Sequence, residues 1–423
     1  MKDIVALLKE NRELSGFRVA ETQTESYELF FVHRKLETVR ARNTKSVSVT
    51  VYADHDGKTG DSTFSVPESM TEDGVREKIS QAVRRAGLVF NEPYSLPEGG
   101  KEQKELPSNL RDADMRELAA KISDAVFAAD CVEGGSINAT EIFLYRDVVR
   151  VINSRGVDKT QVKYRAMIEA IPTFTEGGES VELYEAYTFT QWDAEKITAE
   201  IADKMKEVSL RRKAVKPETP LKMDVVLRAK EISELLSGFT GDLTYASVYS
   251  QSNLHHKGDV LQNGDGDRMT LTMVGQILGS DSSSFFDADG VELKDTTLIR
   301  DGKVTGYYGS HRFASYLGEP ETGDLRCRKL EPGTLTADEL AKGAYLECVS
   351  LSGLQFDLYS DYIGGEIRLA YLHKNGKVEP VTGVTMSAKL SEVLATLRLS
   401  DTVTVDGSYE GPDKLLMRDI SLL

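Results

Sequence analysis

Residues 285–326 read FFDADGVELKDTTLIRDGKVTGYYGSHRFASYLGEPETGDLR, and they decide the fold predicted for the second half of the chain. The stretch opens with the acidic turn Asp287-Ala288-Asp289-Gly290, and a strand ending in Leu298-Ile299 follows. The next residues, Asp301-Gly302, form a dipeptide typical of a tight β-hairpin. The stretch therefore predicts antiparallel strands joined by short turns.

The residues around this stretch continue the pattern of short strands. Alternating apolar and polar residues recur at 268–277, 296–308, 345–358, 366–381 and 402–407, and Asp-Gly or Asn-Gly turns interrupt them. Helical spacing is limited to residues 224–238 and to a late segment at 388–399. Residues 216–423 are therefore expected to form a mostly antiparallel β domain, either a sandwich or a partly open barrel.

The first half of the chain is organised differently, because one order of elements occurs twice. Helical spacing at 3–14 and 72–87 flanks strand-like segments at 26–32 and 46–54. The same helix, strands, helix order returns between the helical segments at 115–126 and 197–208. We predict an α+β fold with two duplicated units, 1–100 and 101–215. Joints rich in proline and charge are expected at 91–109 and 213–222.

Composition excludes several classes of function. The chain is 40% hydrophobic and 28% charged, with a mean hydropathy of −0.33, as in ordinary globular proteins. No segment approaches the roughly 18 apolar residues of a membrane helix, and residues 1–16 lack the apolar core of a secretion signal. We therefore expect a cytoplasmic protein without membrane contact. A net charge of −16 argues against direct binding of nucleic acid. The cysteines, Cys131, Cys327 and Cys348, have irregular spacings that predict reduced thiols.

The stretch at 285–326 resembles the core of the C-terminal domain in the TldD/PmbA family. The acidic turn, the Leu-Ile strand end, the Asp-Gly turn and the Thr322-Gly323 step all occur in family order. In the TldD branch, which consists of zinc peptidases, a helix before this stretch carries His-Glu-x-x-x-His, and a cysteine near the C-terminus completes the site. The helix maps roughly onto residues 224–239, yet no His-Glu pair occurs in the sequence and residues 407–423 contain no cysteine. The chain therefore resembles the PmbA/TldE-like branch.

The resemblance implies a function without a catalytic site of the chain's own. The expected role is that of a non-catalytic subunit that pairs with a TldD-like peptidase and helps to enclose unfolded proteins or peptides. No cofactor is expected in this chain, and zinc is expected in the partner. The family motif positions are expected to be structural or to line a cleft: Asp287, Asp289, Gly290, Asp301, Gly302, Thr322 and Gly323. Asp324 departs from the asparagine found there in many relatives.

Three alternatives stay open from the sequence. The first is an autonomous metal-dependent peptidase that uses His255, Asp265 and Asp267, although residues 258–268 read first as a polar glycine-rich loop. The second is an acidic regulator of DNA gyrase, which the family's older association and the net charge suggest. The third concerns assembly, because a homodimer could form when the partner is absent.

Overall fold

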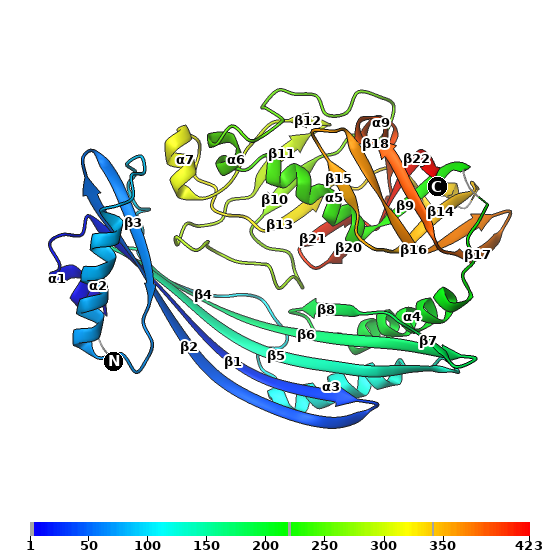
Figure 1. Ribbon diagram of the computed structural model, residues 1–423, viewed down its shortest axis with the longest axis horizontal. Coiled ribbons are helices and arrows are strands. Elements are labelled where there is room, and N and C mark those ends of the chain that lie inside the picture. Colours follow the sequence, from blue (N-terminus) through cyan, green and yellow to red (C-terminus); the bar gives the residue numbers. More distant parts are fainter. Residues whose placement is uncertain (1–3, 219–220, 341) are drawn as a thin grey trace.

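The computed structural model describes residues 4–218, 221–340 and 342–423, and its strands form three sheets in two layers. The first sheet is the lower, curved layer of Figure 1, and residues from 221 onward form the upper layer above it. Residues 219–220 of the predicted joint, and residue 3 of the first predicted helix, lie outside the described residues.

The lower layer is one eight-stranded sheet with the order β3-β2-β1-β5-β6-β4, and β7 and β8 both pair with β6. Its strands are β1 (Gly16–Val32), β2 (Lys35–His55), β3 (Lys58–Ser65), β4 (Lys101–Glu105), β5 (Gly135–Asn153), β6 (Asp158–Glu176), β7 (Glu179–Glu182) and β8 (Glu185–Phe189). β1 of the first predicted unit pairs along its length with β5 of the second unit. The two predicted units therefore share a single sheet.

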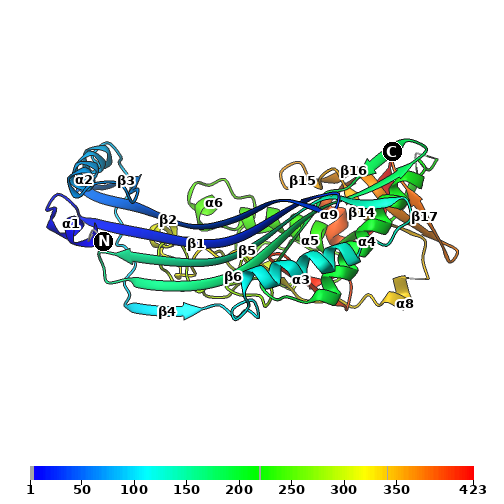
Figure 2. The ribbon, with the colours of Figure 1, turned by 90° about the horizontal axis from the view of Figure 1, so that it is seen from below.

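Four helices cover one face of this sheet, which Figure 2 shows from below. They are α1 (Ile4–Glu10), α2 (Glu72–Ala86), α3 (Met115–Ala128) and α4 (Ala194–Lys213). The helices α1 and α2 pack on one end of the sheet through a cluster that includes Phe17 and Val19. The helices α3 and α4 pack on the other end through Leu29 and Ile142. Because strand side chains alternate between faces, the opposite face of β1, β5 and β6 turns toward the upper layer.

The upper layer contains a six-stranded sheet and a second eight-stranded sheet. The six-stranded sheet has the order β12-β11-β10-β13-β21-β20: β10 (Leu271–Val274), β11 (Thr296–Arg300), β12 (Lys303–Val304), β13 (Cys327–Leu330), β20 (Val403–Asp406) and β21 (Tyr409–Pro412). The other contains β9 (Leu221–Arg228), β14 (Tyr345–Leu351), β15 (Gln355–Asp357), β16 (Tyr362–Lys374), β17 (Lys377–Val381), β18 (Val384–Lys389), β19 (Arg398–Leu399) and β22 (Lys414–Leu422). The helices are α5 (Ala229–Asp242), α6 (Tyr245–Tyr249), α7 (His311–Leu317), α8 (Ala337–Leu340) and α9 (Leu390–Thr396).

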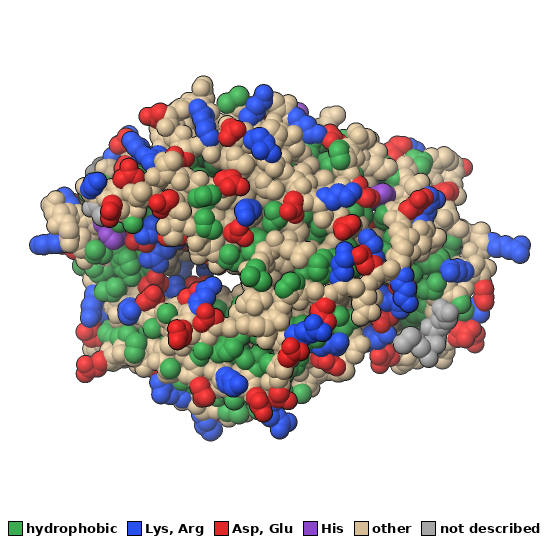
Figure 3. All heavy atoms as spheres, turned by 180° about the vertical axis from the view of Figure 1, so that it is seen from behind, with side chains coloured by type: hydrophobic (Ala, Val, Ile, Leu, Met, Phe, Trp, Pro, Cys, Tyr) green, Lys and Arg blue, Asp and Glu red, His purple; other side chains and the backbone are tan. Residues whose placement is uncertain are grey.

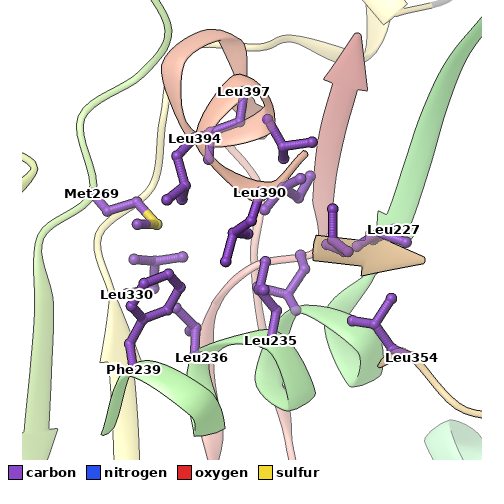
Figure 4. Close-up of a cluster of buried hydrophobic side chains, with 14 of the residues drawn as sticks. Leu227, Leu235, Leu236, Phe239, Met269, Leu330, Leu354, Leu390, Leu394 and Leu397 are labelled. Carbon is purple, nitrogen blue, oxygen red and sulfur yellow. The ribbon is translucent and has the colours of Figure 1, made fainter. Parts of the chain in front are cut away.

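Helix α5 supplies the centre of the upper hydrophobic core. Its Leu235, Leu236 and Phe239 point at Leu390 and Leu394 of α9, as Figure 4 shows. These side chains are at most 5% exposed, so their burial contributes on the order of 2 kcal/mol each. These contacts fix the apolar face of α5 in the core, and its polar side chains lie on the other face.

The predicted α+β class, with mostly antiparallel sheets, is confirmed. The predicted helix at 224–238 is wrong in its first turn, because residues up to Arg228 form strand β9 and the helix begins at Ala229. Val225, Val226 and Leu227 are fully buried between β14 and β22, and a continuous apolar run of this length does not distinguish a buried strand from a helix. The predicted joint at 91–109 contains β4, which pairs in parallel with β6.

No helix formed by the described residues is long and apolar enough to cross a membrane.

Candidate functional site

The candidate site lies around the N-terminal turns of α5, where the lower and upper layers meet. Arg228 is the N-cap residue of α5 and makes no capping hydrogen bond. Its Nη1 donates to Glu207 Oε1 of α4 at 2.7 Å, and its Nε donates to Glu347 Oε1 of β14 at 2.9 Å. Burial disfavours the charged guanidinium, but Glu347 and Glu207 outweigh it and raise the pKa of Arg228. Arg228 therefore ties α4 of the lower layer to the sheet of the upper layer.

Further charged residues extend this contact into what we call the Arg228 network. It consists of Arg228, Glu207 and Glu347 together with Glu185, Lys204, Lys230, His373 and Lys414. Lys204 bridges Glu185 and Glu207 at 3.1 and 2.7 Å. Burial acts to raise the pKa of Glu185, but Lys204 and Lys230 reverse this and lower it. The network is held by cations and anions from both layers.

His373 belongs to the Arg228 network, and its contacts are with residues that hold the sheet together. Its Nε2 lies 3.1 Å from Glu347 Oε2, and its ring stacks on Tyr345 with centroids 4.3 Å apart. Its position on β16 is set by the pairing of His373 with Tyr345 across the sheet.

The acidic turn of the family motif is built around the Asp287 carboxylate. Its Oδ1 accepts hydrogen bonds from the backbone N–H groups of Asp289 and Val291 at 2.9 and 3.0 Å. Its Oδ2 accepts from the Asp324 N–H at 3.1 Å. Asp289 in turn pairs with Arg18 of β1 in the lower layer. The turn thus anchors its own loop and links the two layers.

The remaining motif positions form turns and loop contacts. Asp301 and Gly302 both have positive φ, 49° and 73°, as the two central residues of a tight hairpin turn require. The Gly309 N–H donates to Thr322 Oγ1 at 3.1 Å. Gly290 and Gly323 also have positive φ, 81° and 74°, and a Cβ on Gly323 would lie 2.6 Å from Leu293. These glycines occupy conformations that other residues adopt only with strain.

The three residues of the alternative metal site have other partners. His255 Nδ1 lies 2.9 Å from Asp242 Oδ2, and Asp242 also accepts the His255 backbone N–H. Asp267 Oδ2 accepts the Leu399 N–H at 2.8 Å and lies 3.4 Å from the Arg398 Nε. Asp265 is exposed on the loop. The structure does not gather these three residues with further acids or histidines into a group that could hold a metal, among the residues it describes.

The face of the lower sheet that turns toward the upper layer carries an aromatic row that sequence patterns did not single out. Phe30 meets Phe143 edge-on with centroids 5.6 Å apart, and Phe143 stacks parallel to Tyr145 at 6.1 Å. The Arg165 guanidinium lies 3.9 Å from the centre of the Tyr145 ring. All four side chains are half-buried. Strand register brings them together, since Tyr145 of β5 lies opposite Arg165 of β6.

The two layers touch beyond this row and leave a hollow between them, which Figure 3 shows from behind. Gln161 of β6 donates to Ser284 Oγ at 2.9 Å, and Lys163 donates to the Asp281 carbonyl at 2.6 Å. A cavity of about 100 Å³ lies between β8 and α4 below and the β20–β21 turn above. We call the space between the layers the cleft: the aromatic row lies on the face of the lower sheet that turns toward it, and the β20–β21 turn of the upper layer lines it on the opposite side.

Comparison with known proteins identifies the family of this cleft-bearing fold. Residues 220–422 match the family model described as the PmbA/TldA metallopeptidase C-terminal domain. The metalloprotease PmbA of Escherichia coli O157:H7 is 22% identical over 404 residues, which cover 89% of this chain and 85% of that protein. The chain belongs to the TldD/PmbA family.

Other relatives of the TldD/PmbA family agree with this assignment. A metalloprotease of Synechocystis sp. is 29% identical over 133 residues, which span only 28% of this chain and 29% of that protein. The crystal structure of TldE from Thermococcus kodakarensis superposes with a TM-score of 0.81 at 16% identity, covering 100% of this chain and 99% of that one. A proposed modulator of a DNA gyrase from Thermotoga maritima gives 0.78 at 17% identity, covering 99% and 98%. Both structures share the fold.

The name metallopeptidase in the TldD/PmbA family implies a bound metal ion. The side chains of α5 show whether this chain could bind one there. The helix sequence AKEISELLSGFTGD contains no histidine or cysteine. The side chains at its start include the cations Arg228 and Lys230, which would repel a zinc ion. Across the described part of the chain, no group of three or more His, Cys, Asp or Glu side chains could hold a metal. The residues around α5 therefore do not fit the three-ligand site of a zinc peptidase.

Glu231 on the first turn of α5 makes stability depend on pH. The side chain is only 7% exposed, and burial raises the pKa of Glu231 to about 7. The unfolded value is about 4.3, so the folded state binds more protons between pH 4.3 and 7, and stability falls as pH rises through that window. Glu231→Gln should remove this loss. We expect its free energy of unfolding to exceed the wild-type value by about 2–3 kcal/mol at pH 8 and to match it near pH 4.

Denaturant unfolding at the two pH values measures this effect. Glu234→Gln is the matched control, because Glu234 is exposed on the same helix and its replacement should change stability by less than about 0.5 kcal/mol. Equal pH dependence of the Glu231→Gln variant and the wild type would contradict the assignment.

Proposed function

We propose that this chain is a non-catalytic subunit that pairs with a TldD-like zinc metallopeptidase and helps to enclose unfolded proteins or peptides. The observation that carries the proposal is α5. This helix occupies the region onto which the family's zinc motif maps, yet the residue at its N-cap position is the cation Arg228 and its sequence provides no metal ligand of the histidine or cysteine type. The partner would supply zinc and the activated water, and this chain would supply a wall of the cleft.

Three further observations support the accessory role. The fold matches that of TldE over its full length, and TldE is the name of one member of the family. The cleft between the layers has a half-buried aromatic row on one wall, and aromatic side chains offer large apolar contacts to an extended peptide. Arg228 at the start of α5 is committed to ion pairs with Glu207 of the lower layer and Glu347 of the upper layer, which favours a structural role for it.

Pairing would take place in the cytoplasm, and the same surface could support a homodimer when the peptidase is absent. To test the pairing, the tagged TldD-like peptidase of the same organism is mixed with this chain at micromolar concentration, and the mass is measured by light scattering after gel filtration. We expect a stable complex of the two chains that replaces any homodimer. Elution of both chains as separate species at every mixing ratio would overturn the proposal.

A further inference from the structure

A second cation beside α5, Arg328 of β13, is held only by neutral groups. Its Nε lies 3.3 Å from Thr240 Oγ1, and its Nη1 lies 3.5 Å from Ser233 Oγ and 3.4 Å from Ser408 Oγ. These distances are longer than the 2.7–3.2 Å range of ordinary N–H···O hydrogen bonds, so each contact is weak. The guanidinium is oriented by three hydroxyl groups without being saturated by them.

Arg328 also lacks an acidic partner. No Asp or Glu side chain among the described residues lies within 4.0 Å of its guanidinium. Among the other half-buried arginines, Arg18, Arg150, Arg165 and Arg228 each have one. Arg211 has none within the described part of the chain, and its Nη1 donates to the Glu182 backbone carbonyl at 3.1 Å. Burial lowers the pKa of Arg328, since the charge is removed from water without a compensating carboxylate. Arg328 differs from Arg211 in that hydroxyl groups are its side-chain contacts and no carbonyl of the described residues accepts from its guanidinium, in a chain with 68 acidic residues and 52 basic ones.

Arg328 lies next to a turn that lines the cavity between the layers. Ser408, one of its three hydroxyl neighbours, directly follows the turn residues Val405, Asp406 and Gly407, which line the cavity between the layers. Ser233 and Thr240 lie on α5, the helix onto which the zinc motif of the TldD branch maps. In Figure 1 the strands β13, β20 and β21 form the edge of the upper layer that turns toward the lower sheet.

We propose that Arg328, with the hydroxyl groups of Ser233 and Ser408, binds a carboxylate of the enclosed peptide. The planar guanidinium offers five N–H donors in a fork that matches a carboxylate, and these two hydroxyl groups can turn their hydrogens toward the same anion. The Thr240 hydroxyl donates to the Ser237 carbonyl at 3.2 Å and helps to orient the guanidinium as an acceptor. The carboxylate comes either from the C-terminus of the peptide or from an acidic side chain. This inference rests on the proposed function, because it assumes that peptides enter the cleft.

The test uses the purified chain alone and three peptides of one neutral sequence with an acetylated N-terminus. The first ends in a free carboxylate, the second in an amide, and the third in an amide with one internal Glu. Binding is measured by calorimetry at low ionic strength, where screening is weakest. We expect at least tenfold tighter binding of the first or third peptide than of the second. The peptide that binds identifies the source of the carboxylate.

Two variants and one control make the test specific to Arg328. Arg328→Gln should weaken binding of the preferred peptide at least tenfold. Ser233→Asp places an internal carboxylate beside the guanidinium, so it should also abolish binding while raising Tm, which separates loss of the site from loss of folding. Arg300→Gln is the control, because Arg300 is exposed on β11 and should leave binding unchanged.

Equal binding of all three peptides, or unchanged binding by Arg328→Gln, would overturn the inference. Pairing with the TldD-like peptidase, measured by light scattering, should be unaffected in Arg328→Gln. Carboxylate binding by a chain that never pairs would sink the proposed function and leave this site standing. Pairing without carboxylate binding would overturn the inference about Arg328 and leave the proposed function standing.

Discussion

Replacing Arg228 by glutamine is expected to lower the free energy of unfolding by about 3 kcal/mol. The substitution leaves the carboxylates of Glu207 and Glu347, which are 6% and 7% exposed, without their shared cation. Removing one member of a buried ion pair typically costs about 3–5 kcal/mol, because an uncompensated charge remains in the interior. We expect a cost at the lower end of this range, because both carboxylates keep a second cation. Lys204 lies 2.7 Å from Glu207, and Lys414 lies 4.0 Å from Glu347.

Thermal and urea unfolding of Arg228→Gln and Arg76→Gln provide the comparison. Arg76 pairs with Glu10 and Glu72 on the surface of α2, and water and salt screen such exposed pairs so that they contribute little to stability. Combining Arg228→Met with Glu207→Gln and Glu347→Gln should recover most of the loss, because no buried charge is then unpaired. If Arg228→Gln proves as stable as Arg76→Gln, the Arg228 network does not hold the layers together.

The Arg228 network also gives the wild type a specific response to acid. Burial acts to raise the pKa of Glu347, but Arg228 and Lys414 outweigh it and lower the value. A carboxylate with a lowered folded pKa stabilises the protein above its unfolded value of about 4.3, and this contribution is lost as pH falls through the folded pKa. The stability difference between the wild type and Arg228→Gln should therefore shrink below about pH 4.

Asp287→Ala should have an effect of similar size, about 3 kcal/mol. The change removes the acceptor of three backbone N–H groups, on Asp289, Val291 and Asp324. Each hydrogen bond to a charged group contributes about 1.5–3 kcal/mol, and partial access of water to the opened loop reduces the sum. Since Asp289 pairs with Arg18 of β1, the link between the layers should loosen as well.

Hydrogen exchange of the loop and thermal unfolding test this role of Asp287. Asp287→Asn is the graded control, because its amide oxygen can keep the two bonds at Oδ1 while its NH₂ group cannot accept the Asp324 N–H. We expect Asp287→Asn to lower the free energy of unfolding by less than half as much as Asp287→Ala. Full protection of the Asp289 and Val291 amides in the alanine variant would show that the loop does not depend on this carboxylate.

The sequence predicted the elements whose signals are local. The Asp301-Gly302 turn is defined by two residues that tolerate positive φ, and the helix at 72–87 has a regular apolar face, so both were found with small errors in their ends. The start of α5 was missed because Val225, Val226 and Leu227 are buried on both sides of β9, and such a run has no alternation. Burial on two faces is a property of the sheet and is not encoded in the segment alone.

The residues of the candidate site were harder to predict, since distant pairings assemble them. Arg228 and Glu347 are far apart in sequence and meet because β9 pairs in parallel with β14. Tyr145 and Arg165 face each other only in the register of β5 with β6. Arg328 has no acidic partner among the described residues, and the absence of a neighbour in space leaves no pattern in the local sequence. What the sequence could indicate was the absence of the zinc motif, because that motif is short and continuous.

The most direct test of the central claim is hydrolysis of an unfolded peptide together with measurement of bound zinc. The purified chain is assayed alone, the TldD-like peptidase of the same organism is assayed alone, and the two are assayed as a mixture. The accessory role requires no stoichiometric zinc and no hydrolysis by this chain alone, and a rate in the mixture above that of the peptidase. Stoichiometric zinc and turnover by this chain alone would contradict the account.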